Sequence, residues 1–213
     1  MNIVILSLIG ALVILDKYAI GEFGISQPII SGLIFGAIFG RIPEGIFLGS
    51  VFQLIFLGGL PIGRDIPPDG QGAGLAGCGS YFLLRGSNTP ETALLGAVIL
   101  GLSISIIGGM LEIYFRKFNE KLYYNFMRNE SCLITCHLAG LATAFLRGFI
   151  LLLPVFFIAQ VIILPKLALL TRELIMIIAV SIGVANGVYL FVKKNTIIYL
   201  VLGILCALVS FVF

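Results

Sequence analysis

The chain has 213 residues, of which 60% are hydrophobic and 11% are charged, with a mean hydropathy of +1.16 and a net charge of +3. Soluble domains of this length are far more polar, so the composition indicates a membrane protein. We expect a single membrane-embedded domain over residues 1–213. The positive charge is small and dispersed, and we expect no nucleic-acid partner.

The first segment of the chain predicts a retained membrane element. It opens with Met1-Asn2-Ile3, has no basic region, and shows no small-residue cleavage site before Asp16. A secretory signal peptide carries both of those features. We therefore expect this segment to stay in the protein and in the lipid bilayer.

Runs without charged residues predict the other membrane elements. A straight crossing needs about 20 residues, because the hydrocarbon core is about 30 Å thick and a helix rises about 1.5 Å per residue. Several runs are long enough, but 3–15 and 70–84 are shorter, which suggests re-entrant or discontinuous elements of the kind found in transporters. The fold class predicted is an all-α polytopic membrane protein with re-entrant hairpin elements. The runs are 3–15, 25–40, 44–63, 70–84, 92–111, 131–146, 148–165, 174–192 and 195–213.

Glycine spacing predicts close packing between helices. Gly32, Gly36 and Gly40 lie four residues apart, and Gly45 and Gly49 repeat the spacing. Small residues on one helix face let two backbones approach closely. The pattern indicates where helices pack and says nothing about what the protein carries.

The run that contains Gln53 breaks after residue 57 into a segment rich in glycine and proline that ends at Asp69. A side-chain amide both donates and accepts, which suits sugar hydroxyls, although a hydrogen bond between helices is the alternative. A carboxylate at the membrane centre costs at least about 2.5 kcal/mol, so Asp69 either lies at the membrane surface or binds a ligand. We predict a polar sugar pocket near both residues, in a re-entrant hairpin over about 44–84.

A charged segment at about 112–130 differs from the rest of the chain. Four basic and three acidic residues alternate there with aromatic and aliphatic ones. This pattern is typical of an interfacial helix or loop, and the density of basic residues places it on the cytoplasmic side. It is either a solvated connection or a docking surface for a cytosolic partner.

Chemistry-bearing side chains are few. Cys132, Cys136 and His137 have near-helical spacing, but no fourth ligand follows, so we expect no metal site and no cofactor. His137 is the single histidine and has no paired carboxylate, which favours a packed or hydrogen-bonding role over catalysis. No nucleophile with its base and no phosphate-binding loop is present in the sequence. We therefore expect no catalysis by this chain alone.

A set of short motifs is distributed along the chain: Leu15-Asp16, Gln27-Pro28, Gly49, Gln53-Leu54-Ile55, Leu57-Gly58, Pro61-Ile62-Gly63, Pro67-Pro68-Asp69, His137, Arg147 and Pro154. Together they resemble the IIC membrane subunit of the mannose/fructose/sorbose family of the bacterial phosphoenolpyruvate-dependent sugar phosphotransferase system. The resemblance covers roughly residues 10–190 and is most specific over 45–70.

This resemblance implies a multi-pass sugar permease of the bacterial inner membrane. Such a subunit pairs with a IID membrane subunit in a hetero-oligomer, and cytosolic IIA and IIB proteins deliver the phosphate to the sugar rather than to the permease. Family members carry Glu or Gln at the position of Gln53 and an acid at that of Asp69, so the resemblance leads us to expect that both contact the sugar. Asp65 and His137 are further candidates. Arg64-Asp65 stands where the family has small residues, so this pair either alters the sugar accepted or forms a local ion pair. The family also leads us to expect a further hydrophobic segment after Phe213.

Two other functions fit the same residues. An ion-coupled secondary transporter would bind a proton or sodium at Asp69, Asp65 or Glu44, and a membrane scaffold would transport nothing. The identity of the sugar does not follow from the sequence, because epimers differ by one hydroxyl direction. The chain has no Trp, so stacking on a sugar ring would fall to Phe or Tyr, such as Phe52 and Tyr81.

Overall fold

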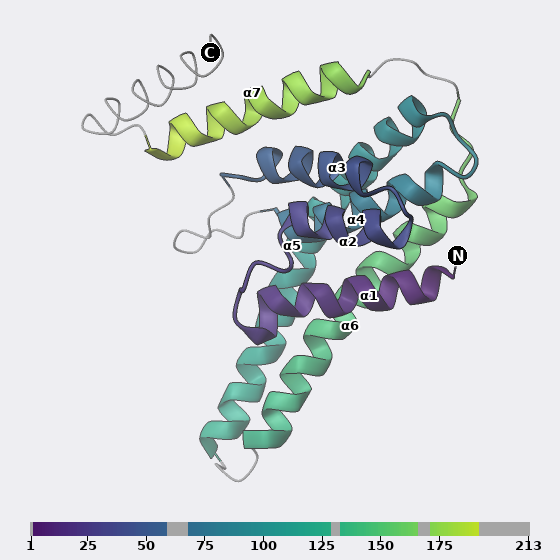
Figure 1. The fold of residues 1–213 in the computed structure, drawn as a ribbon. Helices are drawn as coiled ribbons and strands as arrows, with labels where there is room; N and C mark the ends of the chain where they lie inside the picture. The colour runs from purple at the N-terminus through teal and green to yellow at the C-terminus, as the bar shows by residue number, and fades with distance from the viewer. Residues whose placement is uncertain (1, 59–67, 129–132, 166–170, 192–213) are drawn as a thin grey trace.

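The computed structural model describes residues 2–58, 68–128, 133–165 and 171–191. The regular structure within these ranges is helical (Figure 1), which confirms the predicted all-α class. In chain order the elements are α1 (Ile3–Leu15), the π-helix η1 (Asp16–Ile20), α2 (Pro28–Ile38), α3 (Ile42–Ile55), α4 (Gly70–Leu84), α5 (Pro90–Arg128), α6 (Leu133–Val161) and α7 (Arg172–Phe191).

Three of the described helices are long and apolar enough to cross a membrane: Ile3–Ile20, Pro90–Arg128 and Leu133–Val161. At about 1.5 Å per residue, α5 is about 58 Å long and α6 about 44 Å, both longer than the hydrocarbon core. They run side by side and extend together beyond the other helices (Figure 1). Since α2, α3 and α4 are only 11, 14 and 15 residues long, they reach about half to three-quarters of a bilayer.

Two predicted spans prove to be one helix. The runs 131–146 and 148–165 were separated because of Arg147, but α6 continues through that residue and through Pro154. Arg147 is 1% exposed and pairs with a buried carboxylate, so its charge does not interrupt the helix. A scan for charge-free runs cannot recognise a charge that is neutralised inside the bundle.

The other predicted boundaries agree with the helices in part. The runs 3–15 and 70–84 match α1 and α4, whereas α3 ends at Ile55 instead of 63. The expectation that the first element is too short to span was wrong, because η1 continues α1 to Ile20 and the two together are long and apolar enough to cross a membrane. The segment expected to be an interfacial helix or loop continues α5 as far as Arg128, and its last two residues lie outside the described ranges. The run 195–213 also lies outside them.

The glycine spacing predicted the packing of α2 on α3. A Cβ on Gly32 would collide with the backbone oxygen of Gly45, and a Cβ on Gly49 would lie 2.5 Å from the backbone oxygen of Pro28. The two backbones are therefore in direct contact, as small residues allow. Gly40 is the exception, because it forms the turn after α2 with φ +67° and faces open space.

α4 is the central helix of the bundle, and twelve of its fifteen residues are buried. It contacts α2, α3, α5 and α6, which explains a sequence that is small or apolar on every side. The fully buried ring of Phe52 fits over Gly77 and Gly101, where a Cβ would overlap it. On the far side of α3, α7 is held by Asn186 Nδ2, which donates to the Ile55 carbonyl at 3.1 Å.

We predict that Gly45→Ala destabilises the protein. The added methyl would overlap the backbone of Gly32, so the helices must separate, at a cost of about 1–3 kcal/mol. Circular dichroism melting in detergent should show a midpoint lower by about 2–4 °C per kcal/mol. Gly140→Ala is the control, because that site in α6 faces open space and gains helix propensity. Equal melting of the two variants would contradict this packing.

Candidate functional site

A cavity of about 660 Å³ lies where η1, the loop before α2, the end of α3, the start of α4, and helices α5 and α6 meet. Its lining is mixed in character, with apolar rings beside amides and charged groups. The residues that matter below are Asp16, Lys17, Tyr18, Glu22, Gln27, Gln53, Phe56, Gln71, Glu112, Phe115, Arg116 and Arg147.

Three glutamine side chains from three different elements line this cavity. Gln27 precedes the first residue of α2, Gln53 lies near the end of α3, and Gln71 lies in the first turn of α4. Gln53 Nε2 donates to Gln27 Oε1 at 2.9 Å. The Oε1 atoms of Gln53 and Gln71 are buried without a hydrogen-bond partner among the described residues. Such acceptors are costly to leave unsatisfied, so they favour a ligand that donates hydrogen bonds.

A buried carboxylate shapes the loop that positions Gln27. Asp16 accepts from the backbone amides of Phe23 at 2.8 Å, Gly24 at 3.1 Å and Ser26 at 3.0 Å, and the Ser26 hydroxyl donates to it as well. The loop folds back sharply, with φ +90° at Gly24, a conformation that glycine adopts without strain. Asp16 therefore fixes the entry into α2.

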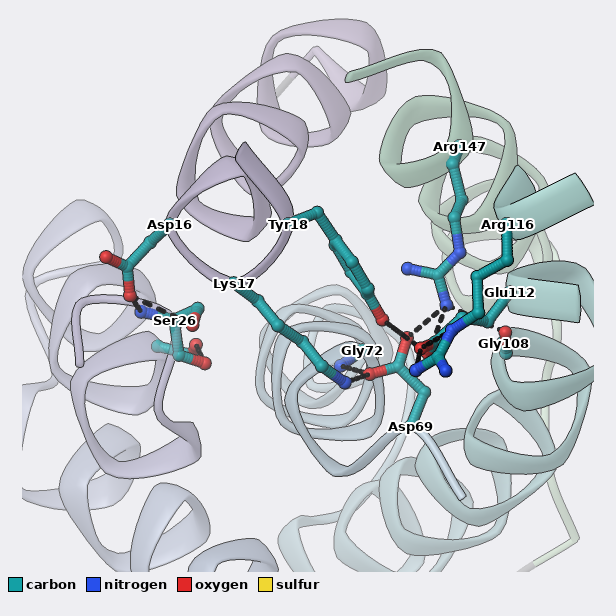
Figure 2. Close-up of polar contacts among 11 residues, drawn as sticks. Asp16, Lys17, Tyr18, Ser26, Asp69, Gly72, Gly108, Glu112, Arg116 and Arg147 are labelled. Carbon is teal, nitrogen blue, oxygen red and sulfur yellow. Dashed lines mark hydrogen bonds and ion pairs between the residues drawn. The ribbon is translucent and has the colours of Figure 1, made fainter. Parts of the chain in front are cut away.

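A second buried carboxylate, Asp69, joins the elements around the cavity and is fully buried. It accepts from Lys17 Nζ at 3.1 Å and from Arg147 Nη2 at 2.9 Å. Its Oδ1 also accepts from the Gly72 amide at 3.1 Å, so the same group caps α4 (Figure 2). One carboxylate thus connects η1, α4 and α6.

Tyr18 and Glu112 extend the cluster. The Tyr18 hydroxyl lies 3.1 Å from Glu112 Oε2 and 3.3 Å from Asp69 Oδ2. Because it has one proton, it donates to one of these carboxylates at a time. Glu112 pairs with Arg116 and lies 3.8 Å from Arg147 Nη2 (Figure 2). The guanidinium of Arg147 stacks 4.2 Å from the centre of the Tyr18 ring. We call Lys17, Tyr18, Asp69, Glu112, Arg116 and Arg147 the ionic cluster.

Small residues on α5 let this cluster form. The Asp69 amide donates to the Ser105 carbonyl at 2.9 Å, which brings the residue against the helix. A Cβ on Gly108 would lie 2.8 Å from the Cβ of Asp69. Arg147 Nη2 donates to the Gly108 carbonyl at 2.7 Å. Glycine at this position therefore makes room for both partners of the buried ion pair.

The predicted site residues fall in different places. Gln53 lines the cavity. Asp69 lies next to the cavity, but its carboxylate is occupied by protein donors and it is not among the lining residues. His137 lines a separate cavity of about 330 Å³, which Tyr18 also borders. Asp65 lies outside the described residues.

The two aromatic residues suggested for stacking on a sugar do not reach the cavity. Phe52 is in the core, and the Tyr81 hydroxyl donates to Glu44 Oε2 at 2.7 Å on another face of α4. The aromatic rings that line the cavity are Tyr18, Phe56 and Phe115.

Sequence reasoning missed most of the ionic cluster. Lys17 and Tyr18 were passed over, and Arg147 was noted only as part of a family pattern. The signal available was a charged residue in an apolar stretch, because such residues inside membranes are usually paired and functional. Gln27 was likewise noted only as part of a family motif, and Gln71 carried no signal, since an amide near a helix end is common on any protein surface.

We predict that Asp69→Ala strongly destabilises the protein. The change leaves Lys17 and Arg147 without their shared countercharge in a buried site, which costs about 3–5 kcal/mol. Arg41→Ala is the matched control, since Arg41 forms a half-exposed ion pair with Glu44 at 3.7 Å that is worth about 1 kcal/mol at most. Melting in detergent measures both. If Asp69→Ala lowers the melting midpoint no more than Arg41→Ala does, the cluster contributes little to stability.

Comparisons with known proteins now add to this geometry. A search of curated proteins gives no match. A solved structure described as "Structure of membrane protein" aligns with a TM-score of 0.69 and 20% identity, over 96% of this chain and 84% of that chain, and shows the shared fold. The family model of the PTS system sorbose-specific IIC component matches residues 1–212. The chain therefore belongs to this family of IIC components, the sugar permease subunits of the phosphotransferase system in the membrane.

Proposed function

We propose that this subunit translocates a hexose-type sugar through the 660 Å³ cavity and presents it to a cytosolic IIB protein for phosphorylation. It works with a IID membrane subunit in a hetero-oligomer of the bacterial inner membrane, and IIA supplies phosphate to IIB. The family membership supports the transport class and the association with other components of the system.

The observation that carries the proposal is the set of unsatisfied amide oxygens in the cavity. Its volume of about 660 Å³ lies within the roughly 300–1,000 Å³ typical of small-molecule sites. Gln53 and Gln71 each contribute a buried acceptor without a partner. A sugar offers several hydroxyl donors and an apolar ring face, so it can satisfy both amides while it packs on a ring such as Phe56.

Asp69 has a supporting role in this proposal. Its carboxylate fixes Lys17 and Arg147 at the edge of the cavity, and a direct contact with sugar requires one of these cations to move. As direct sugar contacts, Asp69, Asp65 and His137 stay predictions for other states of the transport cycle.

The half-length helices suit a transporter. α3 and α4 form the proposed re-entrant hairpin, because each is too short to cross about 30 Å of hydrocarbon and both place polar residues at the cavity. The exposed, charged end of α5 fits the proposed cytoplasmic side. The subunit transports and does not itself transfer phosphate.

We expect Gln53→Ala and Gln71→Ala each to weaken sugar uptake. Each change removes one acceptor for a hydroxyl, worth about 0.5–1.5 kcal/mol, which raises the KM of uptake up to about tenfold. Uptake of labelled sugar by vesicles that contain this subunit and its partners measures the effect. Gln160→Ala is the control, because Gln160 is exposed in α6 and lies at a different groove. Unchanged uptake by both variants would show that the pocket is assigned wrongly.

The same vesicles test the source of energy. We expect uptake to depend on phosphoenolpyruvate and to persist when a protonophore removes the proton gradient. A carboxylate such as Asp69, already paired with two cations, is poorly suited to carry a proton. Loss of uptake with the protonophore would instead support ion coupling.

A further inference from the structure

Two of the three guanidinium nitrogens of Arg147 have no hydrogen-bond partner among the described residues. Its Nη2 donates to Asp69 and to the Gly108 carbonyl, whereas Nη1 and Nε are buried without a partner among the described residues. Arg147 lines the large cavity and is 1% exposed. Figure 2 shows the arm that is not bonded to Asp69 pointing toward Tyr18. Buried donors of a charged group are seldom left unsatisfied, so this arm favours an acceptor that the protein does not supply.

The charges around Arg147 do not balance. The ionic cluster holds three cations, Lys17, Arg116 and Arg147, against two carboxylates, Asp69 and Glu112. Lys17 is also at the cavity, with 19% of its side chain exposed, and it shares Asp69 with Arg147. Two further carboxylates line the cavity, Glu22 and Asp16, and the second is held by donors of the loop before α2. The excess of positive charge is therefore local to Lys17 and Arg147, which share a single carboxylate, Asp69.

We propose that Arg147 and Lys17 form an anion subsite that holds the phosphate monoester of the newly phosphorylated sugar. This inference rests on the proposed function and deepens it, because it assigns a second ligand to the same cavity. Guanidinium N–H groups donate to phosphate oxygens, and Nη1 and Nε are the two nitrogens that remain. They face different edges of the guanidinium, so each donates a single charge-assisted hydrogen bond. The Lys17 ammonium adds a partly exposed point charge.

The consequence is product inhibition at the cavity. The sugar part of the product competes for the glutamine amides, and the phosphate adds an ionic contact that the free sugar lacks. Charge-assisted hydrogen bonds are roughly twice as strong as neutral ones. The product therefore binds more tightly than the free sugar. When it accumulates, it occupies the cavity and slows further uptake.

The test is equilibrium binding of radiolabelled inorganic phosphate to the full chain, purified in a non-ionic detergent without anionic headgroups. We expect saturable binding that sulfate displaces and that chloride at equal ionic strength does not. Absence of saturable binding, or equal displacement by chloride, overturns the subsite.

Two variants locate the bound phosphate. Arg147→Lys keeps a cation beside Asp69 but replaces three nitrogens by one, and we expect affinity to fall about tenfold or more. Lys17→Met should weaken binding by a smaller factor. Arg172→Lys is the control, because Arg172 stacks on Phe47 at the start of α7, away from the cavity. Circular dichroism confirms that each variant is folded, and unchanged affinity in folded Arg147→Lys overturns the assignment.

Competition identifies the source of the phosphate group. Phosphate monoesters of glucose, mannose and fructose, and vesicles of phosphatidylglycerol, are each added to the labelled complex. Displacement by a hexose monophosphate more strongly than by inorganic phosphate supports the product subsite. Displacement by phosphatidylglycerol alone overturns it and indicates a lipid headgroup.

The phosphate measurement is independent of transport. Suppose that phosphate binding is saturable and lost in Arg147→Lys while sugar uptake is unchanged in Gln53→Ala and Gln71→Ala. That result would contradict the proposed sugar site and support the anion subsite. Uptake that depends on both glutamines, without phosphate binding, would keep the proposed function and exclude this inference.

Discussion

A carboxylate with no access to water holds this protein together around its cavity. Asp69 caps α4, pairs with Lys17 of η1 and with Arg147 of α6, and its backbone amide bonds to α5. An unpaired carboxylate in such a place would be costly, so each partner is required by the others. Four of the elements around the cavity, η1, α4, α5 and α6, are therefore held together through this one residue, in a bundle with a largely apolar core.

Close packing of short helices makes the polar interior possible. The glycines of α2 and α3 bring two backbones into contact, and α4 fills the centre with small residues. Three glutamines on the ends of these helices then line one cavity, although they are far apart in sequence. The amides are adjacent to the ionic cluster within that cavity, which gives the site a neutral and a charged part. A sugar and its phosphate ester need these two kinds of contact.

Much of the fold followed from composition and from runs of apolar residues. α1 and α4 begin and end where the charge-free runs do, since hydrocarbon excludes charge except where it is compensated. The split at Arg147 was wrong because compensation comes from Asp69, a residue 78 positions away in sequence. Of the candidate site, Gln53 could be identified as a polar interruption of an apolar run. Gln27 was noted only within a family motif, and Gln71 lies at a helix end, where an amide is common.

Four properties of this protein could be inferred from its residues alone: the membrane class, the helical fold, the family and the glycine contact between α2 and α3. Each of these depends on local composition or on a short motif, which can be recognised without knowing what lies nearby. The folded chain was needed to show that Asp69 pairs with Lys17 and Arg147 and that three glutamines share a cavity. These facts depend on distances between helices, and such distances follow from how the whole bundle packs.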